Sequence, residues 1–219
     1  MEEIIKEERE RIEKMSCYEK KIREKGFEYV AGIDEVGRGP LAGPVVAAAC
    51  ILPANFSLKY INDSKKLTPK MREKLFFQLL SNKEIYYGYG VIDAETIDEV
   101  NILEATFLAM KQAIFNLPKA PDYILFDGNQ MPDIKIPKEG IIKGDSLSIS
   151  IAAASIIAKH LRDKIMEGYH EKFPKYYFHE HKGYGTKKHM AAINQHGPCK
   201  IHRRSFEPIK SLVEKMSSK

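Results

Sequence analysis

The feature that most constrains the fold is the alternation of short apolar runs with longer stretches of helical spacing. Five runs bounded by turn residues have the length of strands, and they cover residues 29–33, 44–52, 84–92, 122–126 and 141–142. Elsewhere apolar residues recur every three or four positions, which predicts helices at 68–79, 97–117, 148–164, 186–196 and 207–216. Strands that come first and then interleave with helices predict an α/β fold, with a mixed central sheet flanked by helices and a helical C-terminal region.

The first 26 residues differ from the rest in composition. Residues 1–25 contain eight acidic and eight basic side chains, and Gly26 follows where a helix commonly ends. A thin apolar seam with helical spacing is formed by Ile5, Ile12, Met15, Tyr18 and Ile22. This pattern predicts an exposed helix laced with ion pairs. We therefore divide the chain into a charged helical extension, 1–26, and a main domain, 27–219.

Composition limits the class of protein. A chain of 219 residues with 43% hydrophobic and 30% charged residues has the composition of one large, folded, soluble domain. The N-terminus lacks the apolar core of a secretory signal, and no apolar run approaches the roughly 20 residues needed to cross a bilayer. Three widely spaced cysteines argue against a disulfide framework and indicate a reducing compartment. We expect a cytoplasmic monomer without membrane contact.

Acidic side chains follow closely on three of the predicted strands. Asp34 and Glu35 come after the first strand, Asp127 follows 122–126, and Asp145 comes shortly after 141–142. Strand ends gather along one edge of an α/β sheet, where ligand sites form. Crowded carboxylates repel one another unless a cation holds them, and oxygen ligands suit Mg²⁺ or Mn²⁺. The four acids therefore predict a divalent-metal site.

Two considerations oppose a four-carboxylate site. Aspartates at strand ends also form turns and cap helices, and Asp145, which precedes two serines, fits such a role. Consecutive strand residues face opposite sides, so Asp34 and Glu35 can share a site only if the strand ends or bulges between them. The following segment, Gly37-Arg38-Gly39-Pro40, makes such a break plausible.

Positive charge is concentrated near the C-terminus. The whole chain has a net charge of +5, whereas residues 182–210 contain seven basic residues and one acid, a local charge of +6. A polyanion would find a positive surface here, although a solvated basic face without a partner fits the same pattern. Structural zinc is an alternative, but zinc sites usually contain two or more closely spaced cysteines, so we favour a basic, partly exposed nucleic-acid surface. The candidate zinc ligands are His179, His181, His189, His196, Cys199 and His202.

One long stretch resembles the signature of a known enzyme family. The segment YVAGIDEVGRGPLAGPVV at 29–46 is similar to the signature of ribonuclease HII, the type 2 ribonuclease H of bacteria. Further motifs follow in the family's order: DSKKL at 63–67, LFDG at 125–128, KGDS at 143–146, AAASIIAK at 152–159, HKGYGT at 181–186 and HRRSF at 202–206. The resemblance covers about residues 27–210 and leaves the charged N-terminal helix outside.

The resemblance implies a ribonuclease H-like fold and hydrolysis of the RNA strand of RNA–DNA hybrids. It also implies two bound Mn²⁺ or Mg²⁺ ions. Carried over by motif, the catalytic and metal-binding acids are Asp34, Glu35, Asp127 and Asp145. Residues 27–219 would then form a catalytic domain whose helical C-terminal region binds the substrate.

The resemblance further implies how a single ribonucleotide in duplex DNA is recognised. In the family, the backbone of the turn that corresponds to Gly37, Arg38 and Gly39 contacts the 2′-hydroxyl, and the tyrosine at Tyr184 packs on the adjacent sugar. Cleavage on the 5′ side of the ribonucleotide would leave 3′-hydroxyl and 5′-phosphate ends. Basic residues in or beside these motifs are predicted phosphate contacts: Lys65, Lys66, Lys187, Lys188, Arg203 and Arg204.

Two other functions compete with this interpretation. A non-catalytic nucleic-acid-binding protein would account for the basic C-terminal region, but acids in a binding groove repel phosphate unless metal lies between them. The sister enzyme ribonuclease HIII is also a metal-dependent hybrid nuclease. The Gly-Arg-Gly turn and the expected lack of a sizeable N-terminal domain favour ribonuclease HII.

Overall fold

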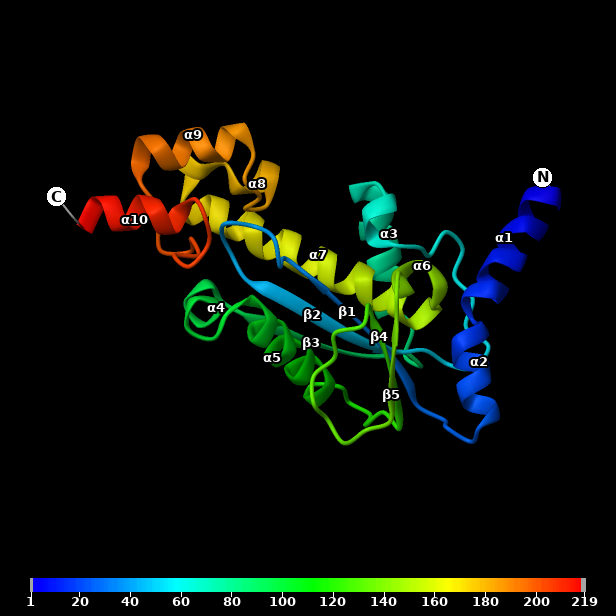
Figure 1. Ribbon diagram of the computed structural model, residues 1–219. Helices are drawn as coiled ribbons and strands as arrows, with labels where there is room; N and C mark the ends of the chain where they lie inside the picture. The colour runs from blue at the N-terminus through cyan, green and yellow to red at the C-terminus, as the bar shows by residue number, and fades with distance from the viewer. Residues whose placement is uncertain (1, 218–219) are drawn as a thin grey trace.

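A mixed sheet forms the centre of the protein. The structure is a computed structural model that describes residues 2–217. Its described strands are ordered β3-β2-β1-β4-β5 in one sheet (Figure 1). β1 and β3 each pair antiparallel with β2, whereas β4 runs parallel to both β1 and β5. The predicted mixed α/β sheet is confirmed, with strands β1 (Val30–Val36), β2 (Val45–Ile51), β3 (Tyr86–Ile92), β4 (Tyr123–Asp127) and β5 (Lys138–Ile141).

Helices cover both faces of this sheet. α7 (Ile149–Lys172), backed by α3 (Pro69–Leu80), packs on one face, and α5 (Ile102–Phe115) packs on the other (Figure 1). The C-terminal helices gather beyond the end of α7: α8 (Phe178–His181), α9 (Lys187–His196) and α10 (Ile209–Ser217). The other helical segments are α1 (Glu2–Met15), α2 (Cys17–Glu24), α4 (Ala94–Val100), α6 (Gly144–Leu147) and the 3₁₀ turns Ser64–Lys66 and Pro174–Tyr176. None of the helices in residues 2–217 is both long and apolar enough to span a membrane.

Strand alternation decides which side chains of β1 face which helix. Ala31 and Ile33 lie in the hydrophobic cluster beneath α5. Gly32 lies on the opposite face, where a methyl group in its place would come within 2.2 Å of the backbone of α7. Asp34 shares this face with Gly32, because residues two apart on a strand point the same way. The close approach of α7 therefore places the helix beside the acidic end of β1.

Two predicted helices are interrupted in the structure. The stretch 97–117 contains parts of two helices, α4 and α5, because Asn101 adopts a φ of 71° between them. The Asn101 side chain accepts hydrogen bonds from the amides of Leu103 and Glu104 at 2.9 and 3.1 Å, so it begins a new helix rather than continuing the old one. The N-terminal helix is likewise divided, at Ser16, whose hydroxyl donates to the Ile12 carbonyl at 2.9 Å.

The N-terminal extension packs into the domain along its apolar seam. Ile12, Met15 and Ile22 are buried, as the spacing predicts, and the side chain of Ile5 lies outside the described residues. Glu19 differs from the expected exposed charge, since it is 1% exposed and accepts hydrogen bonds from Ser150 N at 3.0 Å and Ser150 Oγ at 2.6 Å. The extension therefore contacts the start of α7. Residues 1, 218 and 219 of the two predicted units lie outside the described part of the chain.

Candidate active site

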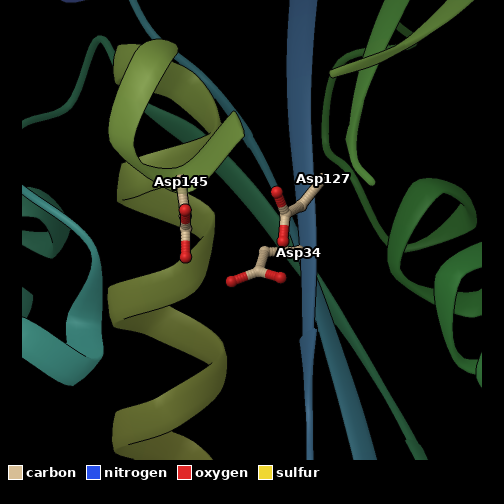
Figure 2. Close-up of side chains that lie close together, drawn as sticks. All are labelled: Asp34, Asp127 and Asp145. Carbon is tan, nitrogen blue, oxygen red and sulfur yellow. The ribbon is translucent and has the colours of Figure 1, made fainter. Parts of the chain in front are cut away.

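Three aspartates from distant parts of the sequence meet at one edge of the sheet. Asp34, Asp127 and Asp145 each place a carboxylate oxygen within 4.8 Å of the other two (Figure 2). The strand register explains the first pair, because Ile33 of β1 lies beside Phe126 of β4 and the next residue of each strand is an aspartate. Both aspartates therefore lie on neighbouring parallel strands and face the same side of the sheet, Asp127 as the last residue of β4 and Asp34 two residues before the end of β1. We call these three residues the aspartate cluster.

Asp145 reaches the cluster from a helix. It lies in the first turn of α6, four residues beyond the end of β5. The amide of Gly144 donates a hydrogen bond of 2.7 Å to Oδ1 of Asp127, which ties the start of α6 to the end of β4. A side chain at Gly144 would come within 2.6 Å of Ile151 Cδ1, so a larger residue there would displace the end of the Ile151 side chain. The predicted proximity of Asp145 to the other acids is correct, although it does not come from a strand end.

Glu35 lies next to the aspartate cluster but outside it. The expected break between Asp34 and Glu35 is wrong, because β1 stays paired with β2 through Val36. Regular alternation then turns the Glu35 side chain away from the face that carries Asp34. Oε1 of Glu35 instead pairs with Nη1 of Arg38 at 3.3 Å. The chain breaks after Val36, at Gly37, where φ is +95°.

The cluster carries strong negative charge in a buried place. Asp34 is 4% exposed, and burial raises its pKa well above the usual value. The charges of Glu35 and Asp127 raise this pKa further, whereas a hydrogen bond from the Ser155 hydroxyl lowers it. Burial also raises the pKa of Asp145, as does the charge of Asp127. The energetic cost of crowding these acids points to a cationic partner.

Lys65 supplies one positive charge at the rim of the cluster. Its Nζ lies 3.9 Å from Oδ2 of Asp145, and its side chain is 72% exposed. Burial alone would lower the pKa of Lys65, but the charges of Asp34 and Asp145 outweigh it and raise the pKa. One mobile ammonium cannot neutralise three carboxylates. Three convergent carboxylates are a donor set that fits hard divalent cations such as Mg²⁺ or Mn²⁺.

The predicted ribose-contacting residues Gly39 and Tyr184 lie in two different loops that meet in the structure. Gly39 and Tyr184 are 145 positions apart in the sequence, yet a methyl group at Gly39 would have one non-neighbouring atom within 4 Å, Cε1 of the Tyr184 ring at 4.0 Å. Tyr184 is 43% exposed and Gly39 is also exposed, so the ring and the backbone of Gly39 lie side by side at the surface, and we call this surface the slot. Arg38 between Gly37 and Gly39 joins this turn to Glu35 through the ion pair described above. We call residues 37–44 the glycine turn.

The predicted phosphate contacts divide into exposed and buried residues. Lys65, Lys66, Lys187, Lys188 and Arg204 are exposed. Lys66 donates to Ser146 Oγ at 2.9 Å, and Lys188 pairs with Glu180 at 2.5 Å.

For Arg203, the prediction of a surface phosphate contact is wrong, because this side chain is 0% exposed. Its guanidinium binds backbone carbonyls of the glycine turn instead.

Three of the C-terminal histidines are not part of the partly exposed basic surface that we expected, whereas His179 and His196 are exposed. His181, His189 and His202 are buried, and Nε2 of His189 lies 3.1 Å from Nε2 of His202. Burial lowers the pKa of His189 and of His202 to about 4, so both are neutral at pH 7. Nδ1 of His189 lies 2.9 Å from the Tyr184 carbonyl, which links these histidines to the residue beside Gly39. Within residues 2–217, the aspartate cluster is the group in which three or more potential metal ligands lie close enough together to hold an ion.

Two buried residues near the site were not singled out from the sequence. Ser155 in α7 contacts both Asp34 and Ser64, with 2.9 Å between the two serine hydroxyls. Arg162, seven residues further along α7, is 0% exposed and binds carbonyls of the glycine turn. A serine or an arginine in a helical pattern carries no signal of this kind. The seven-residue spacing, which places both on one face of α7, is the only hint.

Comparison with known proteins shows the family. The family described as Ribonuclease HII matches residues 31–209. The chain belongs to the ribonuclease HII family. It is 55% identical to a ribonuclease HII of Chlamydia abortus, over 90% of this chain and 92% of that protein. It is 52% identical to a ribonuclease HII of Bacillus thuringiensis, over 97% of this chain and 82% of that protein.

Solved structures agree with the fold. The ribonuclease H2 of Pyrococcus horikoshii superposes with a TM-score of 0.72 at 26% identity, covering 87% of this chain and 99% of that one. A ribonuclease HIII solved with Mn²⁺, named Bst-RNase HIII, gives a TM-score of 0.62 at 17% identity, covering 88% of this chain and 71% of that one. The second likeness shows the shared ribonuclease H-like fold alone.

Membership of the family fixes the general activity. The chain is an endoribonuclease that acts on RNA–DNA hybrids, and the chemistry of the family depends on divalent metal ions. A purely non-catalytic binding protein is therefore excluded. Of the two sister families, the one that matches this chain is ribonuclease HII.

Proposed function

We propose that this ribonuclease HII incises duplex DNA on the 5′ side of a single embedded ribonucleotide, in addition to cleaving longer hybrids. The observation that carries the proposal is the slot between Gly39 and Tyr184. A methyl group added at Gly39 would meet one atom within 4 Å outside its chain neighbours, Cε1 of the Tyr184 ring. A sugar can therefore approach the Gly39 backbone on one side and stack against the exposed ring on the other. A 2′-hydroxyl is the group that distinguishes ribose from deoxyribose, and contact with backbone polar atoms can read it.

The glycine turn is suited to this contact for a conformational reason. Gly37 adopts a φ of +95°, and a methyl group there would come within 2.2 Å of Nε of Arg162. Gly39 has no such constraint in the folded chain. The absence of a side chain at Gly39 is thus unnecessary for folding, and we assign it to the approach of the ribose. The backbone of Gly37, Arg38 and Gly39 then contacts the 2′-hydroxyl, and Tyr184 packs on the sugar.

The acids at the adjacent sheet edge hold the metal. Asp34, Asp127 and Asp145 supply convergent oxygens. Glu35, whose charge acts on Asp34 and whose own pKa is raised by burial and by Asp127, completes the set after its ion pair with Arg38 opens and its side chain rotates. Two divalent cations, Mn²⁺ or Mg²⁺, when bound, supply the activation of water and the stabilisation of the leaving oxygen in an in-line displacement at phosphorus. The products are a 3′-hydroxyl and a 5′-phosphate.

The remaining residues of the site position the substrate. Lys65 lies 3.9 Å from Asp145 with an exposed side chain, so it can contact the scissile region of the phosphate backbone. Lys66, Lys187 and Arg204 are exposed and suit phosphates on either side. Lys188 has to leave Glu180 first. Such contacts orient the duplex without reading its sequence.

Assembly and location complete the proposal. We infer that the enzyme acts as a monomer in the cytoplasm. Its three cysteines are all free, one exposed, one buried and one half-buried, which suits a reducing compartment.

The test uses matched duplexes of the same sequence. One strand is labelled and carries a single ribonucleotide, a continuous RNA tract, or DNA alone, and each duplex is incubated with Mn²⁺, Mg²⁺ or a chelator. We expect a single incision 5′ to the ribonucleotide in the presence of metal, cleavage of the RNA tract, and no cleavage of DNA or in chelator. Incision on the 3′ side, or cleavage of the RNA tract alone, would refute the proposal.

A variant links the outcome to the slot. Tyr184→Ala should lower kcat/KM for the single-ribonucleotide duplex much more than for the RNA tract, because a tract offers many registers. Tyr89→Ala is the matched control, since Tyr89 is a similarly exposed tyrosine, 44% against 43%, on β3 and outside the slot. Equal losses on both substrates in Tyr184→Ala would contradict the assignment.

A further inference from the structure

Two arginines lie buried beneath the glycine turn. Arg162 extends from α7 and Arg203 from the segment between α9 and α10, and both are 0% exposed. Within the described residues, neither guanidinium is hydrogen-bonded to a carboxylate. Burying two arginines without anionic partners is costly, so their contacts must serve a purpose that ordinary packing does not supply.

Arg162 joins the two sides of the slot. Its Nε donates to the carbonyl of Pro44 at 2.9 Å and its Nη2 to that of Ala42 at 3.3 Å, both in the glycine turn. Its Nη1 donates to the carbonyl of Lys182 at 3.0 Å, two residues before Tyr184. One planar group therefore sets the distance between the turn that carries Gly39 and the segment that carries Tyr184.

Arg203 fixes the turn itself. Its Nη2 donates to the carbonyls of Gly37 and Gly43, at 2.5 and 2.8 Å, and its Nη1 donates to that of Arg38 at 2.8 Å. These acceptors lie near the two ends of the glycine turn, so the guanidinium holds the two ends together. The peptide units of Gly37 and Arg38 are the ones that the proposed 2′-hydroxyl contact uses.

Backbone bonds join the same three segments. The amide of Leu41 donates to the Gly183 carbonyl at 2.9 Å, and the amide of Arg203 donates to the Leu41 carbonyl at 2.9 Å. Gly183 has a φ of +88°, and a methyl group there would come within 2.4 Å of the Ala42 carbonyl oxygen. The glycine turn, the 182–184 segment and the 201–203 segment thus form one assembly around the two arginines.

We propose that Arg162 and Arg203 are positioning residues for ribonucleotide selection: they hold the backbone of the glycine turn and the Tyr184 segment at the separation that a ribose requires. The inference rests on the proposed function. It also explains why arginine is needed at both positions. A guanidinium presents five donors in a rigid plane and can hold several fixed carbonyls, whereas the ammonium of lysine gathers three donors around one atom.

The test compares charge-preserving substitutions. Arg203→Lys and Arg162→Lys keep the positive charge and lose the planar set of donors. Arg23→Lys is the matched control, because Arg23 donates from Nη2 to the Leu52 carbonyl at 2.7 Å, near the opposite end of β1 from the glycine turn. For each variant, kcat/KM is measured on the single-ribonucleotide duplex and on a continuous RNA–DNA hybrid of the same sequence, at a temperature where circular dichroism shows the protein folded.

We expect the ratio of the two kcat/KM values to fall by about 10- to 100-fold in Arg203→Lys and Arg162→Lys, because small displacements of reacting groups cost rates of this size. Arg23→Lys should leave the ratio unchanged. A second measurement follows binding alone, in an Asp127→Asn background. There, either arginine variant should lose the preference for a single-ribonucleotide duplex over an all-DNA duplex. If Arg203→Lys does not fold, Arg162→Lys gives the same test through different carbonyls.

The outcomes separate this inference from the proposed function. If the wild type cuts the hybrid but not the single-ribonucleotide duplex, the proposed function fails and the inference fails with it. If the wild type cuts both substrates and a folded arginine variant keeps the wild-type ratio, the inference alone is refuted. An equal loss on both substrates, matching a loss of thermal stability, would show that the arginines serve the fold only.

Discussion

Replacing Asp34 with asparagine should stabilise the metal-free protein while it removes activity. The substitution keeps the size of the side chain and an oxygen that can accept the 2.7 Å hydrogen bond from the Glu35 amide. It removes one of three charges that lie close together. Two unit charges 4.8 Å apart repel each other by about 3.5 kcal/mol at an effective dielectric constant of about 20.

The observable stabilisation is smaller than this repulsion. Burial raises the pKa of Asp34, so proton uptake already relieves part of the strain in the metal-free wild type. We expect Asp34→Asn to raise the free energy of unfolding by about 1–3 kcal/mol without metal. With Mn²⁺ at 1,000 times its Kd the order should reverse, because the ion then stabilises the wild type by about 4.1 kcal/mol and the variant lacks that site.

The assay is urea unfolding of both proteins with chelator and with a series of Mn²⁺ concentrations, beside hybrid cleavage at saturating metal. Loss of several kcal/mol of transition-state stabilisation should lower kcat by about 10³-fold or more. Asp133→Asn is the control, because Asp133 is exposed and lies outside the aspartate cluster. The reasoning is refuted if Asp34→Asn is less stable than the wild type in chelator, gains as much stability from Mn²⁺, or keeps near wild-type turnover.

Three further predictions follow from the geometry. Gly39→Ala should leave the melting temperature unchanged and reduce single-ribonucleotide incision. Gly37→Ala should lower the melting temperature, because φ is +95° at Gly37. A lower melting temperature for Gly39→Ala would contradict this prediction. Lys187→Ala should lower the slope of log Kd for duplex binding against log salt by about 0.9. Lys188→Ala should lower this slope less, because Lys188 pairs with Glu180. Equal slopes for the two variants would contradict the proposed phosphate contacts. Burial lowers the pKa of His189 and His202 to about 4, so the unfolded chain binds more protons below about pH 6.5, and stability should fall between pH 6.5 and 4 by up to about 1.4 kcal/mol per pH unit for each histidine. His202→Gln should flatten that slope, and an unchanged slope in urea titrations would contradict the prediction.

The sheet and the aspartates were predictable because both depend on short-range pattern. Apolar runs of strand length bounded by glycine and proline mark β1, β2 and β4, and Asp127, directly after such a run, is the last residue of β4. Asp34 also follows such a run but lies two residues before the end of β1. The parallel register that sets Asp34 beside Asp127 was not predicted, and the structure supplies it. The alternation rule also predicted the difficulty with Glu35, and the structure shows that the strand continues as the rule requires.

What failed depends on contacts between distant residues. Arg203 looks like a surface charge in a basic segment, and only the fold brings it to carbonyls more than 150 positions earlier. Glu19 similarly looks solvated until the start of α7 supplies Ser148 and Ser150 as donors. The helix break at Asn101 has a local cause, but an asparagine within a helical pattern does not by itself predict a φ of 71°. In each case the partner, which the sequence pattern does not name, decides the outcome.

Anomalous diffraction from crystals soaked in Mn²⁺ tests the central claim most directly, because it locates the metal without reference to activity. We predict Mn²⁺ ions coordinated by Asp34, Asp127 and Asp145, with two sites about 3.5–4 Å apart when substrate is bound. The anomalous signal should be lost in Asp34→Asn. An aspartate cluster without manganese, or a signal at the buried histidines instead, would contradict it.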